Sequence, residues 1–304
     1  GGIEYTCEAF EIQENNYSMS FDGVNDNIVI PEIPNYEENQ HTLSLWVNFS
    51  TLESGDLISK DNEDGDRQWL LHMTLDDNEN IKAHVWTNEG GLSYCSSNIS
   101  PNINTWYHIS QVWDGSVLKL YIDGNLESST PAAGTLVAGD SPIRIGGGSN
   151  NENPLTSPPF YSNSNIDNVQ IWNTALSQQE IQEYMDCSPT GNEDGLVGYW
   201  NFEEGEGATI TDLSDFVNNG IMSDAIYSND TPNQNCPADA ITMYGGDNCE
   251  LTLTLENLVV ENPRCAEQYG YIHFDLNATD NSGNPVIIND GACTVWSSLA
   301  ISPT

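Results

Sequence analysis

Residues 105–126, TWYHISQVWDGSVLKLYIDGNL, constrain the fold most because they read as two β-strands folded back on each other. The second strand has Leu118, Leu120 and Ile122 on one face and alternating residues on the other, which is the two-residue period of a sheet. The two Asp-Gly pairs of the segment can adopt the positive φ that tight hairpin turns require. The first strand carries large side chains on both faces, so we expect it to lie inside a β-sandwich.

The same alternation recurs along the chain and predicts an antiparallel all-β domain. The first three of the following segments have apolar residues at every second position, and the fourth resembles a late strand of the family named below. The segments are LSLWVNF (43–49), WLLHMTL (69–75), IKAHVWT (81–87) and SNIDNVQIWN (164–173). In residues 81–87, this pattern places Lys82, His84 and Trp86 on the face opposite to Ile81.

The motifs W-Y-H, W-D-G and L-K-L-Y-I-D-G, together with F-D-G at residues 21–23, resemble laminin G-like, concanavalin A-like jelly-roll domains. The resemblance extends from about residue 17 to residue 236 and points to bacterial, Bacteroidota-like cell-surface adhesins. It implies an antiparallel jelly-roll β-sandwich. The residue patterns add one short helix and, from the strand candidates ELTLTLENLVV, YGYIHFDLNAT and NPVIIND, a small all-β module after the sandwich. We expect residues 1–15 to be a linker or the end of a preceding module. Residues 16–236 would form the jelly roll and residues 237–304 the small, disulfide-containing module.

Residues 194–222 contain G-Y-W-N-F-E-E-G-E-G, a feature that the family often places before its F-D-G strand. Here it follows the helix, so it either completes the sandwich in a permuted order or begins a second domain. Only about forty residues precede Cys236, too few for another sandwich, so we predict completion. We expect Leu196, Gly198, Trp200 and Phe202 to line one face of this strand.

The segment LSQQEIQEYMD (176–186) predicts the helix. Ser177 and Glu180 have the spacing of a capping box, and Leu176 and Ile181 that of a hydrophobic staple. One apolar stripe indicates that this short helix packs on the edge of the sandwich.

The charge balance limits the possible partners. Forty-six Asp and Glu residues against six Lys and Arg give a formal net charge of −40, which argues against nucleic acid or an anionic membrane surface as partner. Cations are the natural counterpart, although the charge can equally keep a secreted protein dissolved in a salty medium. No apolar run long enough for a membrane span and no signal peptide occur. The chain starts and stops abruptly, so we expect a segment of a longer, processed, extracellular surface protein.

Seven cysteines without a C-x-x-C pair favour disulfides over a zinc site. Cys187 and Cys236 bracket one segment, so we pair them, and we pair two of Cys249, Cys265 and Cys293 with each other. The odd number leaves a free thiol or a partner outside this segment.

Calcium is the cofactor that the sequence favours. Asp22, Asn25 and Asp26 concentrate oxygen ligands in the turn after the first strand, and hard divalent cations prefer such ligands. In jelly rolls of the family that this chain resembles, an ion often joins this turn to the late strand, which implies Asp167 as a further ligand. The alternative is that these side chains only form turns with the backbone.

A glycan or another extracellular surface ligand is the expected partner, with self-association in a fibre also possible. Aromatic side chains that stack on sugar rings and amides that bind hydroxyls are the groups such a site needs. The candidates are Trp69, Trp86, Tyr94, Tyr161 and the loop with Asn150 and Asn151. The alternative for each tryptophan is a place in the core.

The sequence lacks the patterns of the common hydrolases. No E-x-D-x-x-E run is present, Glu203 and Glu204 are adjacent and would point to opposite faces of a strand, and the five histidines are scattered. We therefore expect a non-catalytic extracellular adhesion module that binds a glycan or surface on a calcium-stabilised scaffold. The alternatives are a structural segment of a surface fibre and the accessory domain of a secreted polysaccharide-degrading enzyme.

Overall fold

The computed structural model describes residues 15–31, 39–60, 68–74, 80–137, 139, 141–147 and 160–234, and three strands between residues 252 and 288. The chain divides into two compact units, one of residues 14–235 and one that takes residues 236–304 together with residues 1–13. The larger unit is a sandwich of two antiparallel sheets with one short helix, so the predicted jelly-roll class is confirmed.

The first sheet, called sheet A, has the strand order β10-β9-β8-β3-β12-β1-β16, with β13 also paired to β12. Its strands are β1 (Ser18–Asp22), β3 (His41–Phe49), β8 (Trp106–Trp113), β9 (Val117–Ile122), β10 (Asn125–Pro131), β12 (Asn163–Trp172), β13 (Leu196–Trp200) and β16 (Ile226–Ser228). The predicted hairpin is β8–β9. At its turns Gly115 and Gly124 have φ of +85° and +69°, as the Asp-Gly pairs predicted.

The second sheet, called sheet B, has the order β14-β15-β2-β11-β4-β5-β6-β7. Its strands are β2 (Asn27–Ile30), β4 (Gly55–Lys60), β5 (Trp69–Thr74), β6 (Asn80–Thr87), β7 (Gly91–Ser96), β11 (Ile143–Ile145), β14 (Thr209–Ile210) and β15 (Gly220–Ser223). Strand β7 ends the order, so it forms an edge of the sheet.

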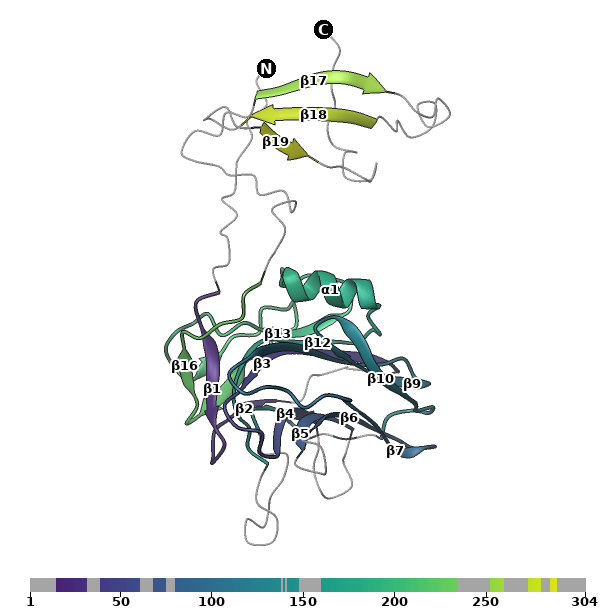
Figure 1. Ribbon diagram of the computed structural model, residues 1–304, viewed down its shortest axis with the longest axis vertical. Coiled ribbons are helices and arrows are strands. Elements are labelled where there is room, and N and C mark those ends of the chain that lie inside the picture. The colour runs from purple at the N-terminus through teal and green to yellow at the C-terminus, as the bar shows by residue number, and fades with distance from the viewer. Residues whose placement is uncertain are drawn as a thin grey trace. The chain divides into compact units, whose positions relative to one another are not determined.

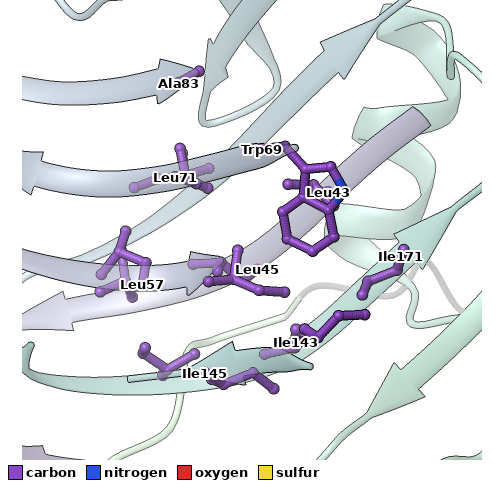
Figure 2. Close-up of a cluster of buried hydrophobic side chains, with 14 of the residues drawn as sticks. Leu43, Leu45, Leu57, Trp69, Leu71, Ala83, Ile143, Ile145 and Ile171 are labelled. Atoms are coloured by element: carbon purple, nitrogen blue, oxygen red, sulfur yellow. The ribbon is translucent and has the colours of Figure 1, made fainter. Parts of the chain in front are cut away.

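One apolar core fills the space between the two sheets (Figure 2). Leu43 and Leu45 of sheet A and Leu57, Trp69 and Leu71 of sheet B are completely buried in it. The inward face of β9 also belongs to this core, as the alternation in the hairpin predicted. Burial of apolar side chains on both inner faces is the main stabilising contribution of such a sandwich.

The helix α1 (Gln178–Asp186) covers part of the outer face of sheet A (Figure 1). It begins at the N-cap Ser177 with the predicted capping box, which pairs Ser177 with Glu180. Ile181 and Leu176 pack in a second apolar cluster against residues of β8, β9, β12 and β13, among them Trp172. Among the described residues, no helix has both the length and the apolar character needed to cross a membrane.

Residues 194–222 complete the sandwich, as predicted. Strand β13 pairs with β12, and β15 pairs with β2. The prediction that Leu196 shares a face with Trp200 is wrong, because the register shifts at Trp172 and leaves Val197 as an extra residue. Trp200 therefore enters the main core while Leu196 packs beneath the helix.

The three strands predicted in the C-terminal part are present as a separate antiparallel sheet. They are β17 (Thr252–Val259), β18 (His273–Thr279) and β19 (Pro285–Ile288), with β18 in the centre.

Leu45→Ala tests the shared core. Leu45 is completely buried between the sheets, so we expect the free energy of unfolding to fall by about 2–5 kcal/mol. The same truncation at Leu126, which is 50% exposed on β10, should change it by less than about 0.5 kcal/mol. Urea unfolding followed by tryptophan fluorescence measures both, and equal losses in the two variants would contradict the core.

Candidate functional site

Three of the predicted calcium ligands lie together in the turn of residues 22–26, here called the Asp22 turn. The backbone N–H groups of Asp22 and Val24 donate hydrogen bonds of 2.8 Å to Asp26 Oδ2 and Asp22 Oδ1. Asn25 Nδ2 donates to Asp224 Oδ2 at 2.7 Å. Asp224, which comes almost two hundred residues later, thus joins the turn, and no local pattern pointed to it.

Carboxylates crowd each other at the Asp22 turn. Burial is the largest cause that raises the pKa of Asp26, and the negative charges of Asp22 and Asp224 raise it further, against the lowering effect of the hydrogen bond from the Asp22 N–H. The described residues contain no group of three or more His, Cys, Asp or Glu side chains arranged to hold a metal ion. The turn therefore offers negative charge and oxygen donors rather than a completed ion site.

Asp167 does not join the Asp22 turn. Asp22 pairs with Asn163, so Asp167 lies four positions farther along β12, about 13 Å away at the usual rise of a strand. Its side chain is completely buried and accepts hydrogen bonds from Asn15 Nδ2 at 3.0 Å and from the Asn168 N–H at 2.7 Å. Burial raises its pKa well above the usual range. The pairing of β3 with β12 shifts register between Asp167 and Gln170.

The outer face of sheet B gathers polar and aromatic side chains from neighbouring strands. Strand β6 alternates strictly, with Ile81, Ala83 and Val85 buried in the core and the residues between them partly exposed. Strand pairing places Tyr94 of β7 and Leu70 of β5 on either side of His84. This face lies on the side of the sandwich away from α1 (Figure 1).

Trp86, His84 and Tyr94 form a stacked group, here called the aromatic row. The His84 ring stacks with both of the others, with ring centroids 5.6 Å from Trp86 at an interplanar angle of 28° and 5.6 Å from Tyr94 at 25°. Lys82 Nζ lies 5.6 Å from the centroid of the Tyr94 ring. Tyr94 is 54% exposed, so a ligand in solvent can reach this end of the row.

The aromatic row continues into two further side chains. His72 Nε2 lies 3.1 Å from His84 Nε2, and Asp56 Oδ1 lies 3.8 Å from His72 Nδ1. Asp56 also forms an isolated bridge with Tyr161, so the predicted contact Tyr161 lies beside this polar group.

The remaining three predicted glycan contacts are Trp69, Asn150 and Asn151. Trp69 is completely buried in the core, so its prediction as a ligand contact is wrong, and the alternative of a core tryptophan holds. Its position on β5 puts it on the inner face, opposite to His72. Asn150 and Asn151 lie outside the described residues.

The cysteine predictions rest largely on residues outside the described part of the chain. Cys187 is disulfide-bonded, but its predicted partner Cys236, like Cys249, Cys265 and Cys293, lies outside it, so these pairings stay predictions. Cys95 is a free, buried cysteine, and burial raises the pKa of its thiol to about 11. This thiol has the character of a core side chain.

Glu203 and Glu204 bind backbone groups. Glu203 Oε1 accepts hydrogen bonds of 2.9 Å from the N–H groups of Asn16 and Tyr17. Glu204 Oε1 accepts one of 2.7 Å from the Thr211 N–H. Glu203 thus holds the residues that precede β1, and Glu204 the residue that follows β14, to the segment after β13.

The participation of His72 and His84 was missed by the sequence analysis. The histidines are scattered in the chain, and only the pairing of β5 with β6 brings these two rings together. The available signal was the alternation of residues 81–87, which already placed His84 on the same face as Trp86.

The comparisons with known proteins agree with this architecture. Residues 22–182, more than half of the chain, match the family described as the concanavalin A-like lectin/glucanases superfamily. No curated protein matches the chain by sequence.

Two solved structures show the same fold at low sequence identity. A candidate carbohydrate binding protein from Bacteroides ovatus has 14% identity and a TM-score of 0.57 over 70% of this chain, which spans 59% of that protein's length. A heptameric SAP-like pentraxin from Limulus polyphemus has 15% identity and a TM-score of 0.50 over 70% of this chain and 94% of its own. By its sequence match and its fold, this chain belongs to the concanavalin A-like lectin/glucanases superfamily.

Proposed function

We propose that this protein is a non-catalytic recognition module that binds glycan on the outer face of sheet B, through the aromatic row. The observation that carries the proposal is the stack of Trp86, His84 and Tyr94 on one sheet face. Membership of a superfamily of lectins and glucanases and the carbohydrate-binding description of the Bacteroides ovatus protein support it.

The chemistry of the aromatic row suits a sugar. The C–H groups on one face of a sugar ring pack against aromatic rings, while its hydroxyl groups need donors and acceptors around that contact. Tyr94 supplies an exposed ring with a hydroxyl group, and Lys82 lies beside this ring. An aromatic surface flanked by polar groups is the composition common to small-molecule sites.

The cellular setting belongs to the same proposal. A formal net charge of −40 disfavours binding to nucleic acid or to an anionic membrane surface. It is compatible with an extracellular adhesion module that contacts neutral glycans on another surface. The module would act within a longer cell-surface protein.

Calcium at the Asp22 turn is a narrower proposal. Asp22, Asp26 and Asp224 would supply carboxylate oxygens, and the ion's charge would offset both the burial of the Asp26 carboxylate and the repulsion from Asp22 and Asp224, which together raise the pKa of Asp26. Asp167 is not included, because its side chain is buried at another position of β12. Such an ion would stiffen the turn between β1 and β2 and leave the aromatic row unchanged.

Truncation of the aromatic row tests glycan binding. We expect Trp86→Ala and Tyr94→Ala each to weaken binding of the best oligosaccharide on a glycan array by about tenfold or more, because each removes a large stacking surface. Isothermal titration with that oligosaccharide measures the change.

Trp106→Ala is the matched control. Trp106 is also partly exposed but lies on β8 of sheet A, where its Nε1 donates to Asp230 Oδ1 at 3.2 Å. Its truncation should leave affinity within about twofold of the parent protein. The proposal fails if the parent binds no oligosaccharide of the array, or if all three variants bind equally well.

Asp26→Asn tests the calcium proposal. In chelator, a raised pKa means that ionisation of Asp26 destabilises the folded state, and this effect grows as pH rises above the ordinary value of 3.8. We therefore expect the variant to melt at a higher temperature than the parent at neutral pH, with the difference vanishing below that value.

At neutral pH, millimolar calcium should reverse the order of the two melting temperatures, so that the parent melts above Asp26→Asn. The ion should raise the melting temperature of the parent through its preferential binding to the folded state, and raise that of Asp26→Asn much less. Differential scanning calorimetry measures the melting temperatures of the parent and of Asp26→Asn, each in calcium and in chelator. Identical parent curves in calcium and in chelator would refute the calcium site without affecting the glycan proposal.

A further inference from the structure

His72 and His84, here called the histidine pair, face each other through the same ring nitrogen. Their Nε2 atoms are 3.1 Å apart, the ring centroids are 4.8 Å apart and the rings are nearly perpendicular, at 83°. Two neutral imidazoles at this distance share one proton in an N–H···N hydrogen bond. A metal ion that binds both Nε2 atoms takes the place of this proton, which moves to Nδ1 of the same ring, so that each imidazole stays neutral.

We propose that the histidine pair is a binding site for a divalent first-row transition metal ion, and that it binds copper(II) most tightly. Imidazole nitrogens lie about 2.0–2.1 Å from such an ion. With the two Nε2 atoms 3.1 Å apart, bonds of this length give an N–metal–N angle of about 100°. This angle falls between square-planar and tetrahedral coordination, so little movement is needed to admit the ion.

Asp56 supports the ligand role of His72. Its Oδ1 lies 3.8 Å from His72 Nδ1, on the far side of the ring from His84, and the Asp56 side chain is 1% exposed. The contact is longer than a hydrogen bond, but the negative charge of the carboxylate beside Nδ1 favours the tautomer with a proton on Nδ1, which leaves the Nε2 lone pair for the metal. Asp56 is therefore a positioning residue, and a carboxylate behind a ligating histidine is a common feature of metal sites.

The aromatic row positions the other ligand. The His84 ring stacks on both Trp86 and Tyr94, so its rotation is restricted before any ion binds. The two histidines come from neighbouring strands β5 and β6 rather than from a loop. A site on paired strands retains its geometry better than one on mobile segments.

The type of donor selects the metal. Nitrogen donors favour copper, nickel and zinc, and affinity increases from nickel to copper in the usual order, whereas calcium and magnesium prefer oxygen. No cluster of three His, Cys, Asp or Glu ligands occurs among the described residues. The ion would complete its coordination with water or with oxygens of a ligand. The site is chemically distinct from the Asp22 turn and does not depend on the glycan proposal.

Copper(II) titration of the full, tag-free chain tests this inference. The titration is done in millimolar magnesium, which occupies the carboxylates. We expect one copper ion per chain and an electron paramagnetic resonance spectrum with couplings to two imidazole nitrogens. His72→Gln and His84→Gln should each lower affinity about tenfold or more and leave coupling to one imidazole at most. His273→Gln, in the separate C-terminal sheet, is the matched control and should bind as the parent does.

Three results would overturn the inference. These are no binding by the parent protein, a parent spectrum with oxygen donors only, and equal affinity in all three variants. Circular dichroism shows whether the variants fold. If His72→Gln or His84→Gln unfolds, the parent spectrum alone decides, because coupling to fewer than two imidazole nitrogens contradicts the pair.

Discussion

The structure depends on the contact between the inner faces of sheets A and B. Leu43 and Leu45 from β3 lie completely buried in one core with Leu57 and Leu71 from β4 and β5. Apolar burial of this kind is not directional, so by itself it only requires that every strand turn one face inward. Strand alternation then dictates that the remaining side chains of each strand point outward. The aromatic row and the histidine pair are a consequence of that division between an inner and an outer face.

The outer faces of sheets A and B carry different side chains. On sheet A, residues such as Trp172 and Tyr199 form a second apolar cluster with Ile181 of the helix. On sheet B, the outer positions of β5 and β6 hold His72, Lys82, His84 and Trp86, side chains that combine polar atoms with aromatic surface. Side chains of this kind suit contact with polar ligands. The helix therefore adds stability on one side of the sandwich, and the other side carries the candidate site.

The sequence identified individual candidate residues more accurately than it predicted which of them lie together in the fold. Trp86 and Tyr94 were singled out as separate aromatics, and strand pairing joined them through His84. Asp22, Asn25 and Asp26 were expected together because they share one turn, and they are together. Asp167 was expected with them from a family resemblance, but the register of β1 against β12 keeps it apart. Trp69 was misplaced because an aromatic side chain does not itself indicate which face of a strand is buried.

The sequence alone indicated the central hairpin, several of the longer strands and the helix, because alternation, Asp-Gly pairs and a capping box are local signals. It gave no such signal for β4, β7 or β10. It also indicated that residues 194–222 complete the sandwich. Only the tertiary structure decided which side chains meet, such as His72 with His84 or Asn25 with Asp224. Those contacts depend on strand order and register, including single-residue shifts such as that at Val197, and register is set by packing of the whole core rather than by any one segment.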